Sequence, residues 1–87
     1  MNNIVSYLKN FHRIELIDVA YRTDKSKWPS LLYKHNGKKK YMSGARTMVL
    51  PDGCAVRITG LSVDDCRVDL RNDTTGEEST VWLNEAN

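Results

Sequence analysis

One short segment combines positive charge with a turn signal, and its side chains are suited to binding phosphate. Its basic or titratable side chains are Lys34, His35, Lys38, Lys39 and Lys40. Between them lies Asn36-Gly37, a pair that suits a two-residue type I′ turn because both residues tolerate positive φ. The sequence therefore predicts a β-hairpin over residues 31–42, with its cations gathered near the turn.

The cross-strand pairing of this hairpin places like charges opposite one another. With a two-residue turn, Lys34 faces Lys39 and His35 faces Lys38, and such pairs destabilise an isolated hairpin. Contact with nucleic-acid phosphates would offset that cost, because lysines that neutralise phosphates release bound counterions. We therefore expect binding to DNA or RNA with little sequence specificity, since phosphate contacts do not read the bases.

Aromatic and further basic residues extend this candidate nucleic-acid site. The aromatic side chains that could stack on unpaired bases are Tyr33, Tyr41 and Trp28. The cations that would widen the patch, if the fold brings their loops to the same side, are Arg22, Lys25, Lys27 and Arg46. Two alternatives stay open: a lysine-rich strand also discourages edge-to-edge pairing, and Tyr33 and Tyr41 could be core residues.

Charge is unevenly distributed along the chain, although its net value is only +2. Residues 22–46 hold eight cations against Asp24 alone, a net charge of +7, whereas residues 47–87 hold three arginines against eight carboxylates, a net charge of −5. The acidic residues that cluster around the turns of the second half are Asp64, Asp65, Asp69, Asp73, Glu77 and Glu78. They suggest an alternative function, a modulator of the phage or mobile-element type that occludes the surface of one protein partner.

No combination of residues predicts catalysis. The two histidines, His12 and His35, are interpreted as surface residues without a catalytic partner. Adjacent residues on a strand point to opposite faces, so neither Asp64-Asp65 nor Glu77-Glu78 forms a convergent acid–base pair. No nucleophile elbow, phosphate loop or metal-ligand spacing is present in the sequence. We therefore expect a non-enzymatic protein without a metal or cofactor.

Residues 54–83 predict a three-stranded antiparallel meander. In residues 54–59, Cys54, Val56 and Ile58 alternate with the smaller or polar residues Ala55, Arg57 and Thr59; residues 66–71 alternate apolar and polar side chains, and residues 80–83 form a third, shorter run. Strict alternation is typical of strands with one face in a core and one in water. Thr75-Gly76 supplies a turn before the third run, because glycine can take the left-handed position.

The expected register of this meander separates the two cysteines. If Thr59 lies opposite Cys66, then Cys54 faces Arg71, and the two cysteines lie at opposite ends of neighbouring strands, too far apart for a disulfide. We therefore expect Cys54 and Cys66 to be free thiols that pack as small hydrophobic side chains.

Residues 2–11 predict a short amphipathic helix. Its apolar residues recur at helical spacing and are Ile4, Tyr7, Leu8 and Phe11. Asn2 or Asn3 could cap the first turn, because an Asn side chain can accept a hydrogen bond from a free amide there. A helix this short is marginal alone, so we expect it to pack on a sheet.

The segment that follows the helix can be read in two ways. Residues 12–22 form either a strand, with a bulge that absorbs the change of phase between Leu16 and Ile17, or a continued helix. The strand is favoured by its β-branched content and because a helix would place Asp18 on the apolar side. Residues 47–50 predict a further short strand before a Pro-Asp-Gly turn.

Together these predicted elements indicate the fold class. Residues 1–87 form one domain, because a chain of this length builds only one hydrophobic core. We expect an α+β fold, with the helix packed on a small, strongly curled antiparallel sheet of five to six strands. The turn spacing of residues 31–83 resembles that of SH3-like and Tudor-like barrels, which implies a partial barrel. No apolar run approaches the roughly 20 residues that span a bilayer, and no secretory leader is apparent, so we expect a cytoplasmic protein.

Overall fold

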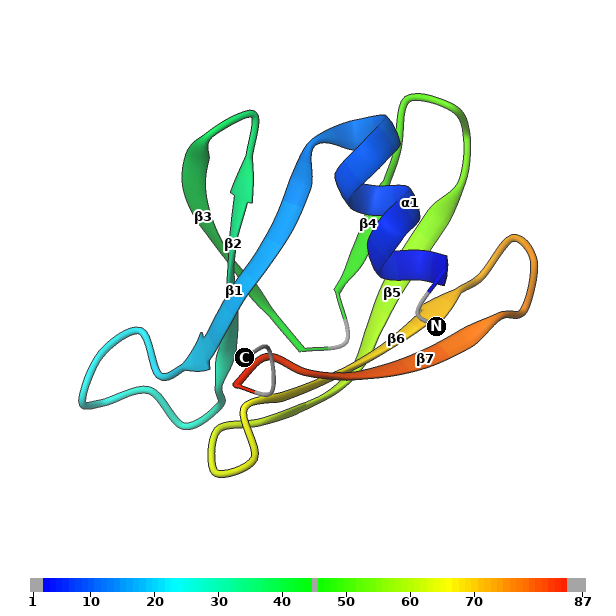
Figure 1. Cartoon of the computed structure of the whole chain (residues 1–87). Coiled ribbons are helices and arrows are strands. Elements are labelled where there is room, and N and C mark those ends of the chain that lie inside the picture. The colour runs from blue at the N-terminus through cyan, green and yellow to red at the C-terminus, as the bar shows by residue number, and fades with distance from the viewer. Residues whose placement is uncertain (1–2, 45, 85–87) are drawn as a thin grey trace.

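The computed structural model describes residues 3–44 and 46–84, and its architecture is α+β (Figure 1). The elements in chain order are α1 (Asn3–His12), β1 (Ile14–Ala20), β2 (Ser30–His35), β3 (Lys38–Ser43), β4 (Thr47–Val49), β5 (Ala55–Ser62), β6 (Arg67–Asn72) and β7 (Glu78–Trp82). The strands form two antiparallel sheets, in the orders β1-β2-β3 and β4-β5-β6-β7. The predicted fold class is confirmed at the level of α+β.

The division into two sheets differs from the single curled sheet predicted from the sequence. The chain leaves β3 after Ser43 and enters β4 at Thr47, and these two strands are not hydrogen-bonded neighbours. Seven strands are present in the described part of the chain, and they do not close into a barrel. The predicted count of five to six strands is therefore wrong, and the SH3-like partial barrel is not confirmed.

Helix α1 joins the two sheets, because it contacts both β1 and β7. Ile4 and Leu8 are buried in a core that also contains Leu31 from the first sheet and Ile58 from the second. The prediction that Phe11 belongs to this apolar face is wrong, since Phe11 is 76% exposed. The proposed cap at Asn2 lies outside the described residues.

Strand β1 confirms the strand interpretation of the segment after the helix. Arg13, with φ of 54°, turns the chain out of α1, and β1 pairs with β2 in antiparallel register. The register shifts between Leu16 and Asp18, so Ile17 is the extra residue of a bulge. This is the place where the apolar pattern changes phase.

The β2–β3 hairpin has the predicted register. Lys34 pairs with Lys39, His35 with Lys38, and Tyr33 with Lys40. Asn36 and Gly37 have φ of 53° and 82°, as a type I′ turn requires. We call β2, β3 and this turn the lysine hairpin. Its turn lies on the same side of the molecule as the carboxyl-terminal end of α1 (Figure 1).

The β5–β6–β7 meander is present, but the predicted β5–β6 register is wrong. Strand β5 continues to Ser62, and a bulge shifts the register between Ile58 and Gly60. The register differs from the predicted one mainly because β5 turns back only after Ser62, which pairs with Arg67, so Arg71 faces Arg57 and not Cys54. The bulge places both Ile58 and Leu61 on the inner side, so the alternation seen in residues 54–59 did not show where the strand ends.

The cysteines lie next to this meander and carry free thiols. Cys66 occupies the turn before β6 with φ of 50°, and Cys54 precedes β5. Both side chains are half-buried, so neither packs as a fully buried core residue. The helix in the described part of the chain, α1, is too short to cross a membrane.

Candidate nucleic-acid interface

The lysine hairpin exposes its cations along an edge strand. Strand β3 lies at the edge of the β1–β2–β3 sheet, and Lys38, Lys39 and Lys40 are all exposed on it. Successive residues of a strand point to opposite faces, so Lys39 shares one face with Lys34 while Lys38 and Lys40 share the other. Lys34 and His35 on β2 are half-buried. The hairpin therefore presents positive charge on both faces near its turn.

These lysines are not neutralised by the chain itself. Within the described part of the chain, every ion pair involves His12 or one of the three arginines Arg57, Arg67 and Arg71. Glu15 faces Lys34 across β1 and β2, but no ion pair joins them. The positive charge of the hairpin is therefore available to an external anion.

Two cations that the sequence analysis did not assign to the site lie beside the hairpin turn. Lys9 from the last turn of α1 and Arg13 line a surface cavity of about 390 Å³ together with Lys34, Glu15 and the turn residues Asn36 and Gly37. The Asn36 amide donates a hydrogen bond to the Arg13 carbonyl oxygen at 3.1 Å, which holds the two turns together. A prediction that β1 pairs with β2 would have found these residues, because that pairing brings Arg13 to the hairpin turn.

The three aromatic candidates occupy different environments. Tyr33 is 8% exposed and belongs to the core, which is the alternative that the sequence left open. Tyr41 and Trp28 are 47% and 77% exposed, so their rings are accessible. Trp28 precedes β2, at the end of the hairpin remote from its turn. A stacking role for Tyr33 is therefore excluded by its burial, whereas Tyr41 and Trp28 have the exposure that such a role requires.

The additional cations form a second group at this remote end. The Arg22 guanidinium lies over the Tyr41 ring, 5.1 Å from its centroid, and both side chains line a cavity of about 300 Å³ with Arg46. Lys27 lines a cavity with Trp28, whereas Lys25 is exposed in the same loop and lines neither of these cavities. The structure thus divides the predicted patch into a cluster at the hairpin turn and a cluster at its base.

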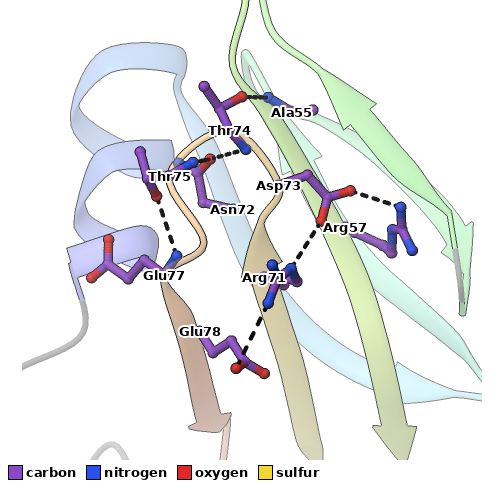
Figure 2. Close-up of polar contacts among 9 residues, drawn as sticks. All are labelled: Ala55, Arg57, Arg71, Asn72, Asp73, Thr74, Thr75, Glu77 and Glu78. Carbon is purple, nitrogen blue, oxygen red and sulfur yellow. Dashed lines mark hydrogen bonds and ion pairs between the residues drawn. The ribbon is translucent and has the colours of Figure 1, made fainter.

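Most of the acidic residues proposed for protein binding are paired with arginines of the same half, and Figure 2 shows the pairs of Asp73 and Glu78. Asp73 Oδ2 lies 2.9 Å from Arg57 Nη2, and Asp73 Oδ1 lies 3.2 Å from Arg71 Nε. The other pairs are Glu78 with Arg71 at 3.8 Å, Asp65 with Arg67 at 3.3 Å and Asp69 with Arg67 at 3.6 Å. Of the six residues, only Asp64 and Glu77 form no ion pair within the described chain.

Hydrogen bonds fix the turn that carries part of this acidic group. The Asn72 side-chain oxygen accepts hydrogen bonds from the Thr74 and Thr75 amides, and the Thr75 hydroxyl oxygen accepts one from the Glu77 amide (Figure 2). Thr74 in turn accepts a hydrogen bond from the Ala55 amide at 3.1 Å. The β6–β7 turn is therefore tied both to itself and to the start of β5.

His12 has a role that the sequence analysis missed, because it contacts two polar side chains. Its Nε2 lies 3.1 Å from the Tyr7 hydroxyl and 3.2 Å from Asp52 Oδ2, and the Tyr7 hydroxyl donates a hydrogen bond to the same carboxylate. The hydrogen bond from Tyr7 above all, then that from the Cys54 amide at 3.0 Å, and lastly His12 lower the pKa of Asp52 to about 2. Burial and the Asp52 carboxylate raise the pKa of Tyr7. The cluster ties α1 to the turn before β5, so the interpretation of His12 as an unengaged surface residue is wrong.

No protein-family model, curated protein or solved structure matches this chain. Among residues 3–44 and 46–84, no three His, Cys, Asp or Glu side chains are grouped so that they could hold a metal ion. The surface charge and the exposed aromatic residues of this structure are the features that bear on its function.

Proposed function

We propose that this protein is a small non-enzymatic regulatory protein that binds nucleic acid through the lysine hairpin. One observation supports the proposal most strongly: Lys34 and Lys39 are direct cross-strand partners, and neither forms an ion pair with a carboxylate of the described chain, not even Lys34 with Glu15 opposite it on β1. Two lysines held face to face repel one another, and phosphates lying over the pair would remove that repulsion.

The position of the other cations favours the phosphate backbone of a nucleic acid as the ligand over a small anion. Lys9 and Arg13 lie beside the hairpin turn, and Arg22 and Arg46 lie at its base, so positive charge follows the length of the hairpin. Phosphates spaced along a nucleic-acid strand match such a row of cations, and each contact releases counterions. Contacts of this kind position the ligand but do not read its sequence.

The test is a salt titration of binding to a fluorescein-labelled oligonucleotide of mixed sequence, followed by fluorescence anisotropy. If six or more cations contact phosphates, the affinity should fall by about 10³-fold or more between about 50 and 200 mM salt. Changing Lys38, Lys39 and Lys40 together to Ala should abolish binding at the higher salt and reduce the slope of log K against log salt by about 2 to 3.

A matched pair of single variants distinguishes a specific contribution of the lysine hairpin to binding from the effect of removing one positive charge anywhere on the surface. Lys39→Ala and Lys25→Ala each remove one exposed lysine, but only Lys39 faces another lysine on the hairpin. Lys39→Ala should weaken binding clearly more than Lys25→Ala. Retained affinity in the triple-alanine variant, or equal losses in the two single variants, would contradict the proposal.

Edge protection remains the competing explanation of these lysines, because β3 is an edge strand. It makes a different prediction for the same triple-alanine variant. If the lysines only prevent edge-to-edge pairing, the variant should self-associate in size-exclusion chromatography, and the wild-type protein should show no salt-dependent binding to the oligonucleotide.

The alternative function, protein binding through the acidic loops, has weaker support. Four of the six acidic residues are engaged by Arg57, Arg67 or Arg71, which reduces the charge they offer to a partner. Its test is a pull-down in the presence of nuclease. One stoichiometric protein partner that is lost when Asp64 and Asp65 are changed to Asn would favour the alternative.

A further inference from the structure

Two cavities lie at the base of the lysine hairpin and share one lining residue, and their linings differ in chemistry. The first, of about 540 Å³, is lined by Trp28, Pro29 and Leu61 among others, and we call it the Trp28 cavity. The second, of about 300 Å³, is lined by Arg22, Tyr41 and Arg46 among others, and we call it the arginine cavity. Ser43 at the end of β3 lines both, so the two cavities are neighbours.

The Trp28 cavity has the character of a platform for a planar ring. Trp28 is 77% exposed although it is the largest apolar side chain type, and Pro29 and Leu61 lie beside it. Gly44 and Gly60 line the same cavity without contributing a side chain. Its volume lies within the range of about 300–1,000 Å³ typical of small-ligand sites, which are mostly apolar with a few polar groups.

The arginine cavity has the character of an anion site. Neither Arg22 nor Arg46 forms an ion pair with a carboxylate of the described chain, and no carboxylate lines the cavity. The stacking of Arg22 on Tyr41 restricts its guanidinium, and the Arg46 carbonyl oxygen accepts a hydrogen bond from the Ile58 amide at 2.9 Å. The contact with Tyr41 thus orients the guanidinium of Arg22, whereas the hydrogen bond from Ile58 fixes only the backbone of Arg46; a guanidinium can donate two parallel hydrogen bonds to a phosphate.

We propose that these two cavities together bind one nucleotide of a single strand, with its base against Trp28 and its phosphate between Arg22 and Arg46. The inference rests on the proposed function and names its substrate class, single-stranded nucleic acid. In a duplex both faces of a base are covered by stacking, so only an unpaired base can lie against an exposed indole. The lysine hairpin would then hold the neighbouring phosphates of the same strand.

The two tryptophans of the chain allow a matched test. Trp28 lies in the cavity, whereas Trp82 is an exposed tryptophan on β7, in the other sheet. Trp28→Ala should weaken binding to a single-stranded oligonucleotide by about 5- to 150-fold, as expected for the loss of one base–aromatic stack. It should leave binding to the corresponding duplex unchanged, and Trp82→Ala should change neither. Trp28→Phe should retain part of the single-strand affinity.

The phosphate half of the site has its own test. Arg22→Gln and Arg46→Gln should each reduce the slope of log K against log salt for the single strand by about 0.7. Circular dichroism of each variant before titration checks that it is folded. If Trp28→Ala is unfolded, the single-strand and duplex affinities of Trp28→Phe are compared with those of wild type instead.

The results distinguish failure of this inference from failure of the proposed function. If Trp28→Ala and Trp28→Phe leave single-strand binding unchanged, or weaken single strand and duplex equally, the inference is overturned. The proposed function still stands in that case, provided that the triple-alanine variant of Lys38, Lys39 and Lys40 loses binding. If that variant binds as tightly as wild type, the proposed function itself fails.

Discussion

Arg57 and Arg71 are direct cross-strand partners on β5 and β6, and one carboxylate, that of Asp73, pairs with both. Lys34 and Lys39 are opposed in the same way on β2 and β3, yet no carboxylate of the described chain pairs with them. The protein therefore neutralises one pair of opposed cations internally and leaves the other without an internal ion pair. This difference is the basis of the first two predictions.

Removing the Asp73 charge should destabilise the fold. In Asp73→Asn the two opposed arginines lose their shared counter-ion, and we expect the free energy of unfolding to fall by about 1 kcal/mol, a value reduced by the partial exposure of all three side chains. Urea denaturation at low salt measures the change. The difference from wild type should shrink at high salt, because salt screens the repulsion.

The control for this variant is Asp64→Asn, since Asp64 is exposed and forms no ion pair within the described chain. It should change the free energy of unfolding by less than about 0.5 kcal/mol. Equal losses in the two variants would contradict a specific role for Asp73.

Reversing one charge of the lysine pair should raise stability and reduce binding at the same time. In Lys39→Glu an attractive cross-strand pair with Lys34 replaces a repulsive one, which we expect to stabilise the hairpin by roughly 0.2–1 kcal/mol. The same change should weaken oligonucleotide binding more than Lys25→Glu, which carries an equal change of charge. Thermal unfolding and anisotropy measure the two effects, and a Lys39→Glu protein that binds like wild type would count against the hairpin as the interface.

The Tyr7–Asp52 contact should make stability dependent on pH in the acid range. Because the folded state lowers the pKa of Asp52 to about 2, chiefly through the hydrogen bond from Tyr7, its contribution is present above about pH 4 and is lost as the pH falls towards 2. Tyr7→Phe removes the main donor, so the fall in melting temperature over this range should become less steep.

The Tyr7–Asp52 contact should also make stability dependent on pH in the alkaline range. The pKa of Tyr7 is raised in the folded state, by burial first and then by Asp52, so its contribution is complete below about pH 10 and is lost as the pH rises further. Tyr7→Phe should lack this alkaline loss, whereas Tyr21→Phe, which changes an exposed tyrosine, should keep both pH responses. Unchanged profiles in Tyr7→Phe would show that the contact contributes nothing to stability.

Cys66 should react slowly with thiol reagents. Burial and the Asp18 carboxylate, which accepts a hydrogen bond from the Cys66 thiol at 3.2 Å, raise the pKa of this thiol. The reactive thiolate is therefore scarce at about pH 8, and alkylation by iodoacetamide in a Cys54→Ser background should be slower than for a free thiol. Adding Asp18→Asn should accelerate the reaction, and mass spectrometry measures both rates. A rate unaffected by Asp18→Asn would assign the slow reaction to burial alone.

Several elements could be predicted from the sequence because their determinants lie within a few residues. Asn36-Gly37 sets the register of the lysine hairpin, since a two-residue turn leaves one way to pair the flanking strands. The change of apolar phase at Ile17 marks the bulge in β1 for the same local reason. The Thr75-Gly76 turn and the alternating side chains before it likewise predicted the strands of the β5–β6–β7 meander, but they did not predict the register of β5 with β6.

What the sequence left open depends on which distant segments meet. Strand β5 turns back only after Ser62, which changes its register with β6, and the pairing of β1 with β2 brought Arg13 to the hairpin turn. Where β5 turns back and which strand pairs with β1 both depend on contacts between residues distant in the sequence, so neighbouring residues alone do not specify them.

By itself, the sequence determined where along the chain the cations and carboxylates occur, and that one hairpin would gather lysines on facing strands. Only the tertiary structure decided which charges are neutralised: it placed Asp73 against Arg57 and Arg71 and placed no carboxylate of the described chain against Lys39. The physical reason is that an ion pair requires contact between side chains, and contact between distant residues is set by strand register and packing, not by the order of charges in the chain.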